Sequence, residues 1–211
     1  MIRKLIYTDS NFNNEMNKYL NQNSIKKNRV ENKVKNILKD VLENGDKALV
    51  KYTKLYDNYD VDASGLILRK EEVNIAKDSC DIREIEALEM AAERISNYQK
   101  KLIPNDLNYV DETGTMLGCK WSSIDSCGIY TPGGKAMYPS SVLMNAIPAR
   151  LANVDRIVMV VPTVAGYINP LVLVAAEICK IEEVYLVGGA QAIGGLAFGT
   201  ESIEKVDECR G

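Results

Sequence analysis

The sequence predicts an α/β protein in which a helical N-terminal region is followed by a parallel sheet with helices on both faces. Only two of the 14 glycines and one of the six prolines precede residue 113, so turn-forming residues are concentrated in the second half. Beyond residue 125, apolar runs of strand length alternate with helical segments, which is typical of parallel strands buried on both faces. Near residue 130 a short apolar run leads through a Pro-Gly-Gly turn into a helix, the order in which α/β folds build ligand crevices.

The first two predicted helices differ in how much apolar surface they carry. Residues 10–22 predict a short polar helix capped by Ser10. Its small apolar surface is expected to pack on another element, such as a partner subunit. Residues 27–43 predict an amphipathic helix that ends at Gly45, because glycine tolerates the left-handed conformation after a helix. The apolar stripe of this second helix consists of Val30, Val34, Ile37, Leu38, Val41 and Leu42.

Three more segments complete the predicted helical region. Asp46 is predicted to cap a helix over 46–56. Residues 61–68 predict a loop or short strand, and 70–79 a helix of one or two turns. The longest helix is predicted over 82–102, where a following proline stops it. The side chains expected on the inner face of the 46–56 helix are Leu49, Tyr52 and either Leu55 or Tyr56.

A β-hairpin is predicted within residues 108–131. The segment alternates in character and contains Gly114 and Gly118 as turn residues. Trp121, the only tryptophan, is expected in the core rather than at a ligand platform.

The second half then predicts helix, strand, helix, strand and helix. Ser140 and Ser141 are candidate caps for a helix beginning near Val142. Pro148 lies inside that helix and predicts a kink or an early end.

Two apolar strands and two further helices follow. The strands are predicted over 156–161 and 184–187. Asn169-Pro170 predicts a helix start, with a capping side chain and a proline in the first turn. The last helix is predicted over 190–198, directly after a glycine turn.

The candidate ligand crevice is predicted where the strands end. The relevant turns are 130–134 and 188–191, and the carboxyl ends of parallel strands meet at one edge of a sheet. An ordinary strand-to-helix turn would give the same pattern. The sequence has no G-x-G-x-x-G fingerprint, so residue pattern alone supports at most a nonstandard nucleotide crevice.

Composition excludes several functional classes. A net charge of −3 argues against nucleic acid or an anionic membrane as the main partner. No run of about 18 apolar residues indicates a membrane span, and the apolar part of the N-terminus is too short for a signal peptide, so a cytoplasmic location is expected. With no histidine, the chain cannot hold a Ser-His-Asp triad, a Cys-His pair or a histidine metal ligand. The five scattered cysteines predict reduced, mostly buried thiols.

At several stretches the chain resembles the histidinol dehydrogenase family. The wording Gly128-Ile-Tyr-Thr-Pro-Gly-Gly-Lys-Ala-Met-Tyr-Pro-Ser-Ser-Val-Leu-Met-Asn-Ala-Ile-Pro-Ala-Arg150 matches family members closely. So do Asn169-Pro-Leu-Val-Leu, Val187-Gly-Gly-Ala-Gln-Ala-Ile193 and Gly199-Thr-Glu-Ser-Ile203. Residues 27–57 are similar to the family's early helices. The resemblance covers essentially the whole chain, and it makes the parallel sheet an incomplete Rossmann-like domain.

The resemblance implies an NAD-dependent oxidation of L-histidinol to L-histidine through the aldehyde, the last step of histidine biosynthesis. It also implies a catalytic zinc and a homodimer. Tyr130 and Gln191 match the family's NAD-contacting tyrosine and glutamine. Without the family, these two residues would be a half-buried ring and a polar residue at a helix start.

The chain departs from the family in its length. Family members continue well past Gly211, and their third NAD contact, zinc ligands and catalytic Glu-His pair come later. We therefore expect a truncated chain without catalytic or metal residues and with little activity alone. Cys209-Arg210 stands where the family has a buried apolar strand, and burying an arginine there would be costly.

The sequence gives a three-part domain organisation and leaves two alternatives to an enzyme fragment. The parts are a helical arm over 1–25, a mostly helical domain with a hairpin over 26–127, and an incomplete Rossmann-like NAD-binding domain over 128–211. One alternative is a catalytically silent nucleotide-binding module or pseudoenzyme. The other is an interaction protein that dimerises through its polar N-terminal helix.

Overall fold

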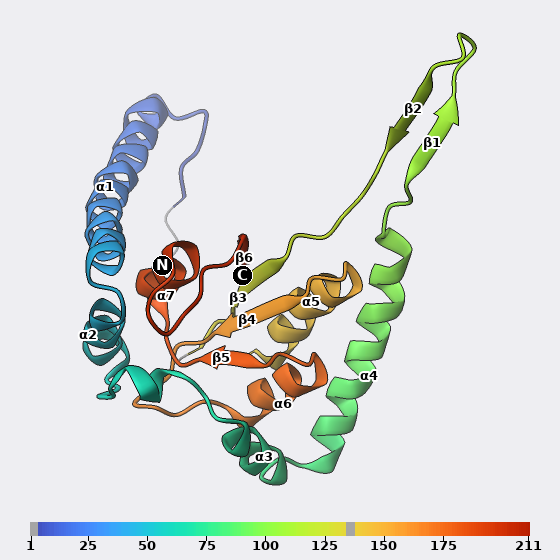
Figure 1. Cartoon of the computed structure of the whole chain (residues 1–211). Coiled ribbons are helices and arrows are strands. Elements are labelled where there is room, and N and C mark those ends of the chain that lie inside the picture. The colour runs from blue at the N-terminus through green and yellow to red at the C-terminus, as the bar shows by residue number, and fades with distance from the viewer. Residues whose placement is uncertain (1–3, 134–137) are drawn as a thin grey trace.

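A four-stranded parallel sheet lies at the centre of the protein, with strand order β5-β4-β3-β6 (Figure 1). The computed structural model describes residues 4–133 and 138–211, without the side chains of 21–29 and 70. Each strand is short, and β6, which carries two charged residues, forms one edge of the sheet. The strands are β3 (Ser126–Tyr130), β4 (Arg156–Val160), β5 (Glu183–Tyr185) and β6 (Glu208–Arg210).

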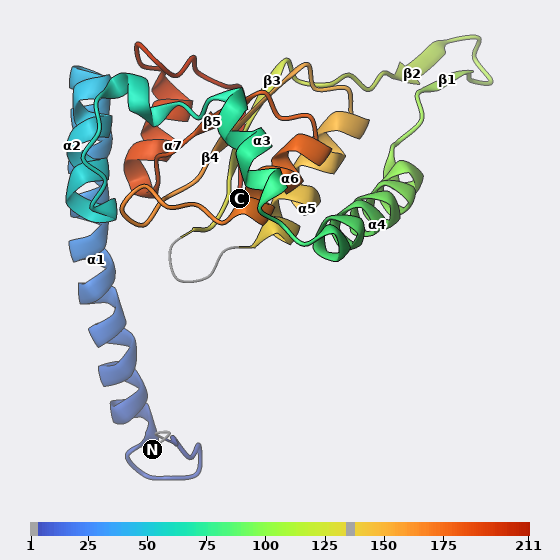
Figure 2. The ribbon, with the colours of Figure 1, turned by 90° about the horizontal axis from the view of Figure 1, so that it is seen from below.

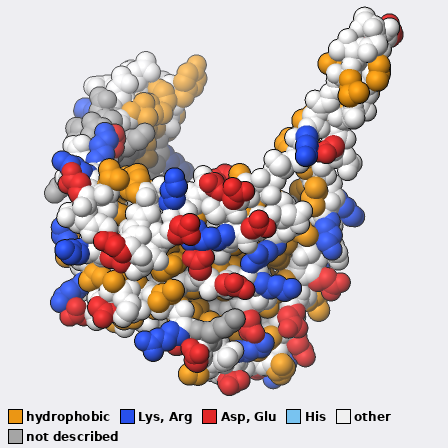
Figure 3. Space-filling view, in the orientation of Figure 1, with side chains coloured by type: hydrophobic (Ala, Val, Ile, Leu, Met, Phe, Trp, Pro, Cys, Tyr) orange, Lys and Arg blue, Asp and Glu red, His pale blue; other side chains and the backbone are white. Residues whose placement is uncertain are grey.

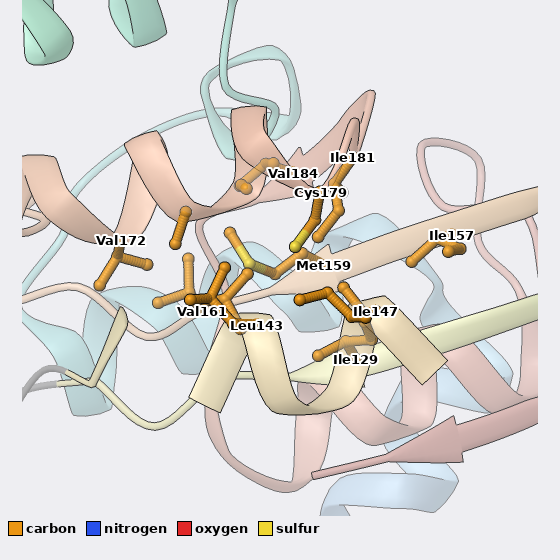
Figure 4. Close-up of a cluster of buried hydrophobic side chains, with 14 of the residues drawn as sticks. Ile129, Leu143, Ile147, Ile157, Met159, Val161, Val172, Cys179, Ile181 and Val184 are labelled. Carbon is orange, nitrogen blue, oxygen red and sulfur yellow. The ribbon is translucent and has the colours of Figure 1, made fainter. Parts of the chain in front are cut away.

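Helices cover both faces of this sheet, which confirms the predicted fold class (Figure 2). Successive residues of a strand point to opposite faces, and in β4 Met159 belongs to one core cluster while Val158 and Val160 belong to the other. The first cluster packs beneath α4, α5 and α6, and the second beneath α1, α2 and α7. Figure 4 shows side chains of the first cluster. The helices are α1 (Phe12–Asn44), α2 (Asp46–Asp57), α3 (Lys70–Asp78), α4 (Ile82–Gln99), α5 (Pro139–Leu151), α6 (Pro170–Ile178) and α7 (Gly189–Phe198).

The N-terminal region is one continuous helix of 33 residues, so the two separate helices predicted over 10–22 and 27–43 were wrong. The intervening stretch contains no glycine or proline, and polar residues alone do not break a helix. Asn11 is the N-cap residue, and no side chain caps this end, so the predicted role of Ser10 was also wrong.

Only the C-terminal half of α1 lies against the body of the protein, where it packs on α7. Ile37 and Val41 are buried there, as the predicted stripe requires. Val30 and Leu42, from the same predicted stripe, are exposed. Only part of the predicted apolar stripe is therefore buried.

Helix α2 begins after Gly45, whose φ of 51° is in the left-handed region that favours glycine. Asp46 is the first helical residue rather than the cap that was predicted. Its carboxylate instead accepts hydrogen bonds from the backbone N–H and the hydroxyl of Ser202. Its own N–H donates to the Glu201 carboxylate at 2.9 Å, so this residue ties α2 to the loop before β6.

The inner face of α2 is shorter than predicted. Leu49 and Tyr52 are buried, whereas Leu55 and Tyr56 are both exposed.

A carboxylate joins α1 to α2. Asp40 accepts hydrogen bonds from Lys51 Nζ at 2.6 Å, from the Tyr52 hydroxyl at 2.8 Å and from Asn44 Nδ2 at 2.7 Å. The hydrogen bond from Lys51, followed by those from Tyr52 and Asn44, lowers the pKa of Asp40 to about 2.

This depressed pKa predicts a pH dependence of stability. A carboxyl whose folded pKa lies below its unfolded value of about 3.9 stabilises the fold above that value, and the contribution is lost as pH falls toward about 2. We expect thermal unfolding to show Asp40→Asn destabilised at pH 5 to 7, with the difference from wild type shrinking below pH 4. Asp78→Asn, an exposed position at the end of α3, is the control. A difference that stays constant down to pH 2 would contradict the assignment.

The region between α2 and the sheet follows the prediction except at three points. Residues 61–68, predicted as a loop or short strand, contain a 3-10 helix over Ala63–Leu66, and Ile67 forms a single bridge to Tyr185. Helix α4 ends at Gln99 and a 3-10 turn, Lys100–Leu102, completes the predicted segment. Trp121 is 58% exposed, so its predicted place in the core was wrong. The predicted helix over 70–79 and the β-hairpin are confirmed, the hairpin as β1 (Leu107–Val110) and β2 (Met116–Cys119).

Helix α5 begins three residues earlier than predicted. Pro139 is its first residue, so Ser140 and Ser141 lie within the first turn, and no side chain caps the helix. Pro148 does not end the helix, which continues to Leu151. Only one turn remains after Pro148, and its carbonyl still accepts the N–H of Ala152 at 2.9 Å.

Helix α6 starts as predicted, since the Asn169 side chain accepts the N–H of Leu171 at 2.8 Å.

The edge strand β6 is held by one side-chain clamp. The Asp207 carboxylate accepts the backbone N–H of Ser126 at 2.8 Å and its hydroxyl at 3.0 Å. Because nothing in the described chain covers its outer side, the Arg210 side chain is 68% exposed and the expected burial cost does not arise.

The five cysteines are free thiols, but only Cys127 and Cys179 are buried, so the prediction of mostly buried thiols was wrong. Among the described residues, none of the helices is long and apolar enough to span a membrane.

Candidate functional site

The strand order reverses between β3 and β6. The connections through α5 and α6 add strands on one side of β3, and the connection through α7 returns to its other side. In open parallel sheets ligands bind at the carboxyl ends of the strands beside such a reversal. Tyr130 is the last residue of β3 and Arg210 is the last residue of β6, so these residues mark the candidate site.

The two turns that were predicted to share one edge do meet there. The phenolic oxygen of Tyr130 accepts the backbone N–H of Gly189 at 3.1 Å. This hydrogen bond joins the end of β3 to the first residue of α7. The other end of the first turn, Gly134, lies outside the described residues.

A third turn, the one that follows β4, also reaches this edge, and its proline lies between the other two turns. Pro162 follows β4, and a Cβ atom added at either Gly133 or Gly188 would overlap it. At Gly133 the overlap is with the Pro162 carbonyl oxygen, and at Gly188 it is with the proline ring. The absence of a side chain at these two glycines therefore lets the three strand ends pack together.

Gln191 is buried beside this junction, with 1% of its surface exposed. Among the described residues, neither its amide oxygen nor its amide nitrogen has a hydrogen-bond partner. A Cβ at Gly189 would lie 2.7 Å from the Gln191 Oε1, so the amide lies over the first residue of α7, where φ is +63°. A buried amide without partners is costly. Gln191 follows two residues that line the groove described below, Gly189 and Ala190, and is not itself part of that lining.

Two further polar groups were missed by sequence reasoning. Thr131 follows β3 and Thr163 follows β4, and both are buried with hydroxyls that have no partner among the described residues. Each of the three strand ends thus carries one buried polar side chain without a partner. The sequence signal that could have identified these residues is a polar side chain shortly after each apolar strand.

An open groove of about 490 Å³ lies at this edge, beside the start of α7. Burial, with a smaller contribution from Glu208, raises the pKa of the Cys209 thiol, so this group stays protonated at neutral pH and is a poor nucleophile. The described residues contain no group of three or more Cys, Asp or Glu side chains placed to hold a metal ion. The groove can bind a ligand with both apolar and hydrogen-bonding parts. It is lined by Tyr130, Gly189, Ala190, Ile193, Cys209, Arg210 and Gly211.

Comparison with known proteins gives one consistent family. The family model described as histidinol dehydrogenase matches residues 20–211. The histidinol dehydrogenase of Mesorhizobium japonicum is 51% identical over 77% of this chain and 38% of its own length. The histidinol dehydrogenase of Brucella abortus is 42% identical over 98% of this chain and 48% of its own length. That of Nitrosomonas europaea is 43% identical over 100% of this chain and 49% of its own length.

A solved structure agrees with the sequence comparison. The histidinol dehydrogenase of Elizabethkingia anophelis superposes with a TM-score of 0.82 at 34% sequence identity, covering 86% of this chain and 42% of that chain. The chain therefore spans about half the length of the relatives that it matches.

Proposed function

The chain belongs to the histidinol dehydrogenase family, and on that basis we propose that it supplies the NAD-binding part of an enzyme that oxidises L-histidinol to L-histidine through histidinaldehyde. The family is one of oxidoreductases in histidine biosynthesis. The observation that carries the proposal is the junction of three strand ends, where Tyr130 meets Gly189 and the Gln191 amide is buried without a partner.

The residues at the junction fit an NAD site. The Tyr130 ring and the apolar wall of the groove would pack against the flat rings of the cofactor, and the Gln191 amide can both donate and accept hydrogen bonds. Bound NAD would supply the hydride acceptor of the reaction. The role of this chain is to bind and orient the cofactor. The groove offers no histidine, and its one thiol has a raised pKa, so we assign it no proton transfer.

The described residues do not offer a zinc ion a set of ligands. We propose that the zinc ligands and the catalytic Glu-His pair of the family belong to the half that this sequence does not include. We also propose a homodimer, which the family resemblance implies. A cytoplasmic location and a division into 1–25, 26–127 and 128–211, both expected from the sequence, are proposed as well.

A second candidate is a catalytically silent module that binds a nucleotide. It is favoured by the Tyr130–Gly189 hydrogen bond, which joins the two turns within this chain alone. Both candidates predict NAD binding. They differ when the chain is mixed with the C-terminal half of a relative, such as that of Brucella abortus: a fragment restores NADH formation from L-histidinol, and a silent module does not.

The site is tested first by calorimetric titration of the purified chain with NAD. We expect binding that Gln191→Leu weakens at least tenfold, because leucine fills the volume but removes both polar atoms. Gln99→Leu, at the end of α4, is the matched control and should bind as wild type does. No binding at millimolar NAD would overturn the proposal. Unchanged binding by a folded Gln191→Leu variant would remove only this residue from the site.

A further inference from the structure

Two buried oxygen atoms without partners lie near the C-terminal end of α2. Thr53 is fully buried, and neither its hydroxyl nor the Oδ2 atom of Asp57 has a hydrogen-bond partner among the described residues. Residues four apart in a helix lie on one face, with their Cβ atoms about 5–6 Å apart. One small ligand can therefore contact both oxygens.

The turn after β4 packs against this end of α2 (Figures 1 and 2). The N–H of Ala165 donates to the Asp57 carbonyl oxygen at 2.9 Å. Across the turn, Val164 and Tyr167 exchange two backbone hydrogen bonds, at 3.2 and 3.0 Å. Thr163 comes just before this pair and is buried, and its hydroxyl has no partner among the described residues. Both sides of this contact thus carry buried oxygens that are not satisfied within the described chain.

The Asp57 carboxylate also lacks a positive charge beside it. Burial raises the pKa of Asp57, with no contribution from a charged group of the described residues. Asp57 is the last residue of α2, where the helix dipole adds partial negative charge. Lys54, the basic residue of this last turn, instead donates to Asp60 at 2.7 Å. A water molecule would satisfy the oxygens but not the charge, whereas a cation would do both.

The oxygens favour a cation of single charge. Divalent cations are usually held by several carboxylates, and the described residues contain no group of three or more acidic or cysteine side chains placed for a metal ion. One carboxylate with neutral hydroxyls matches a single positive charge. The last turn of a helix also leaves carbonyl oxygens without helical partners, and carbonyl oxygens are ligands that K⁺ accepts.

We propose that a monovalent alkali cation, Na⁺ or K⁺, binds between the end of α2 and the turn after β4, with the Asp57 carboxylate and the Thr53 hydroxyl among its ligands. The cation joins these two segments in addition to the hydrogen bond from Ala165. None of these residues lines the groove beside α7, so the site is distinct from the candidate NAD site.

The first test is thermal unfolding in KCl, NaCl and choline chloride at one ionic strength. A ligand that binds the folded state raises its melting temperature, and we expect wild type to melt about 2–4 °C higher in the better alkali salt than in choline chloride. Figure 3 shows Lys and Arg side chains interspersed with Asp and Glu over the body. Screening of such surface charges depends on ionic strength, which is the same in all three salts.

Two nearly isosteric variants remove the proposed ligands. Asp57→Asn removes the charge and should melt at the same temperature in all three salts. Thr53→Val replaces an unpartnered hydroxyl with a methyl group, so it should be at least as stable as wild type in choline chloride and should lose at least half of the gain in the alkali salt. The control is Asp78→Asn, which changes the last residue of α3 at an exposed position and should keep the full gain.

The second test detects the cation directly. We expect the sodium-23 NMR signal to be broadened by wild type and by Asp78→Asn, and the broadening to be reduced at least threefold in Asp57→Asn. Replacing choline chloride with KCl at constant ionic strength should reverse the broadening, because K⁺ competes for the same oxygens.

Three results would overturn the proposal. One is a wild-type melting temperature that is equal in all three salts, as expected if water fills the space. Another is a gain in alkali salt that Asp57→Asn retains in full. The third is sodium broadening that is equal in Asp57→Asn and Asp78→Asn. A full gain in Thr53→Val would contradict the place of Thr53 among the ligands. Neither test uses NAD, so both are independent of the proposed function.

Discussion

Gly188→Ala is expected to lower the free energy of unfolding by about 1–3 kcal/mol, because its new methyl group overlaps Pro162. It should also weaken NAD binding more than tenfold, since relief of the overlap must move the turn that positions Gln191. The backbone of Gly188 is extended and any residue adopts it, so the effect comes from space and not from conformation. Urea unfolding and NAD titration of the same samples measure both effects.

A second substitution shows whether overlap with Pro162, rather than another cause, destabilises Gly188→Ala. Pro162→Gly removes the ring atoms that Gly188→Ala would meet, so the double variant should recover much of the lost stability. The same substitution should not rescue Gly133→Ala, whose methyl group overlaps the carbonyl oxygen at residue 162. Equal rescue of both variants would show that the wedge explanation is wrong.

Arg156→Met is expected to lower the free energy of unfolding by about 2–3 kcal/mol. The guanidinium donates to both carboxylate oxygens of Glu183, at 2.7 and 2.8 Å, and both side chains are partly buried. It also donates to the carbonyls of Glu204 and Lys205, at 3.2 and 3.3 Å. Methionine would fill the space but leave a half-buried carboxylate and two carbonyls without their donor.

The control for Arg156 is an exposed ion pair in the same protein. Lys77 lies 3.2 Å from Glu177, with both side chains about 40% exposed, and such pairs contribute about 0–1 kcal/mol. Thermal unfolding of Arg156→Met and Lys77→Met should therefore differ clearly. Arg156→Met/Glu183→Met should be less destabilised than Arg156→Met alone, because the orphaned charge is removed. Equal melting temperatures for all three variants would mean that the pair is structurally neutral.

The parallel sheet and the meeting of its two turns were predictable because their signals are local. Asn169-Pro170 specifies a helix start within two residues, and the observed hydrogen bond to Leu171 follows directly from it. The turn at Gly188 follows an apolar run and leads straight into α7. The carboxyl ends of parallel strands must share an edge, so the meeting of Tyr130 and Gly189 followed from topology.

The wrong predictions concern positions where tertiary context decides. Trp121 is exposed because it follows a hairpin that leaves the body, and apolar character alone does not reveal that departure. Ser140 does not cap α5, because Pro139 takes the first helical position and moves the start of the helix. Arg210 avoids burial only because β6 is an edge strand of this chain. The roles of Tyr130 and Gln191 in NAD binding remain predictions.

The strand order also sets the sequence in which the sheet assembles. Ser126 pairs with Arg156 and Val158 with Glu183, so β3, β4 and β5 join by closing loops of about 30 residues or fewer. The clamp between Ser126 and Asp207 closes a loop of 81 residues. By the logarithmic dependence of loop entropy on length, that closure costs about 0.9 kcal/mol more than one of about 30 residues. We therefore expect the three-stranded core to form before β6 joins β3, so that the crevice between β3 and β6 is completed late in folding.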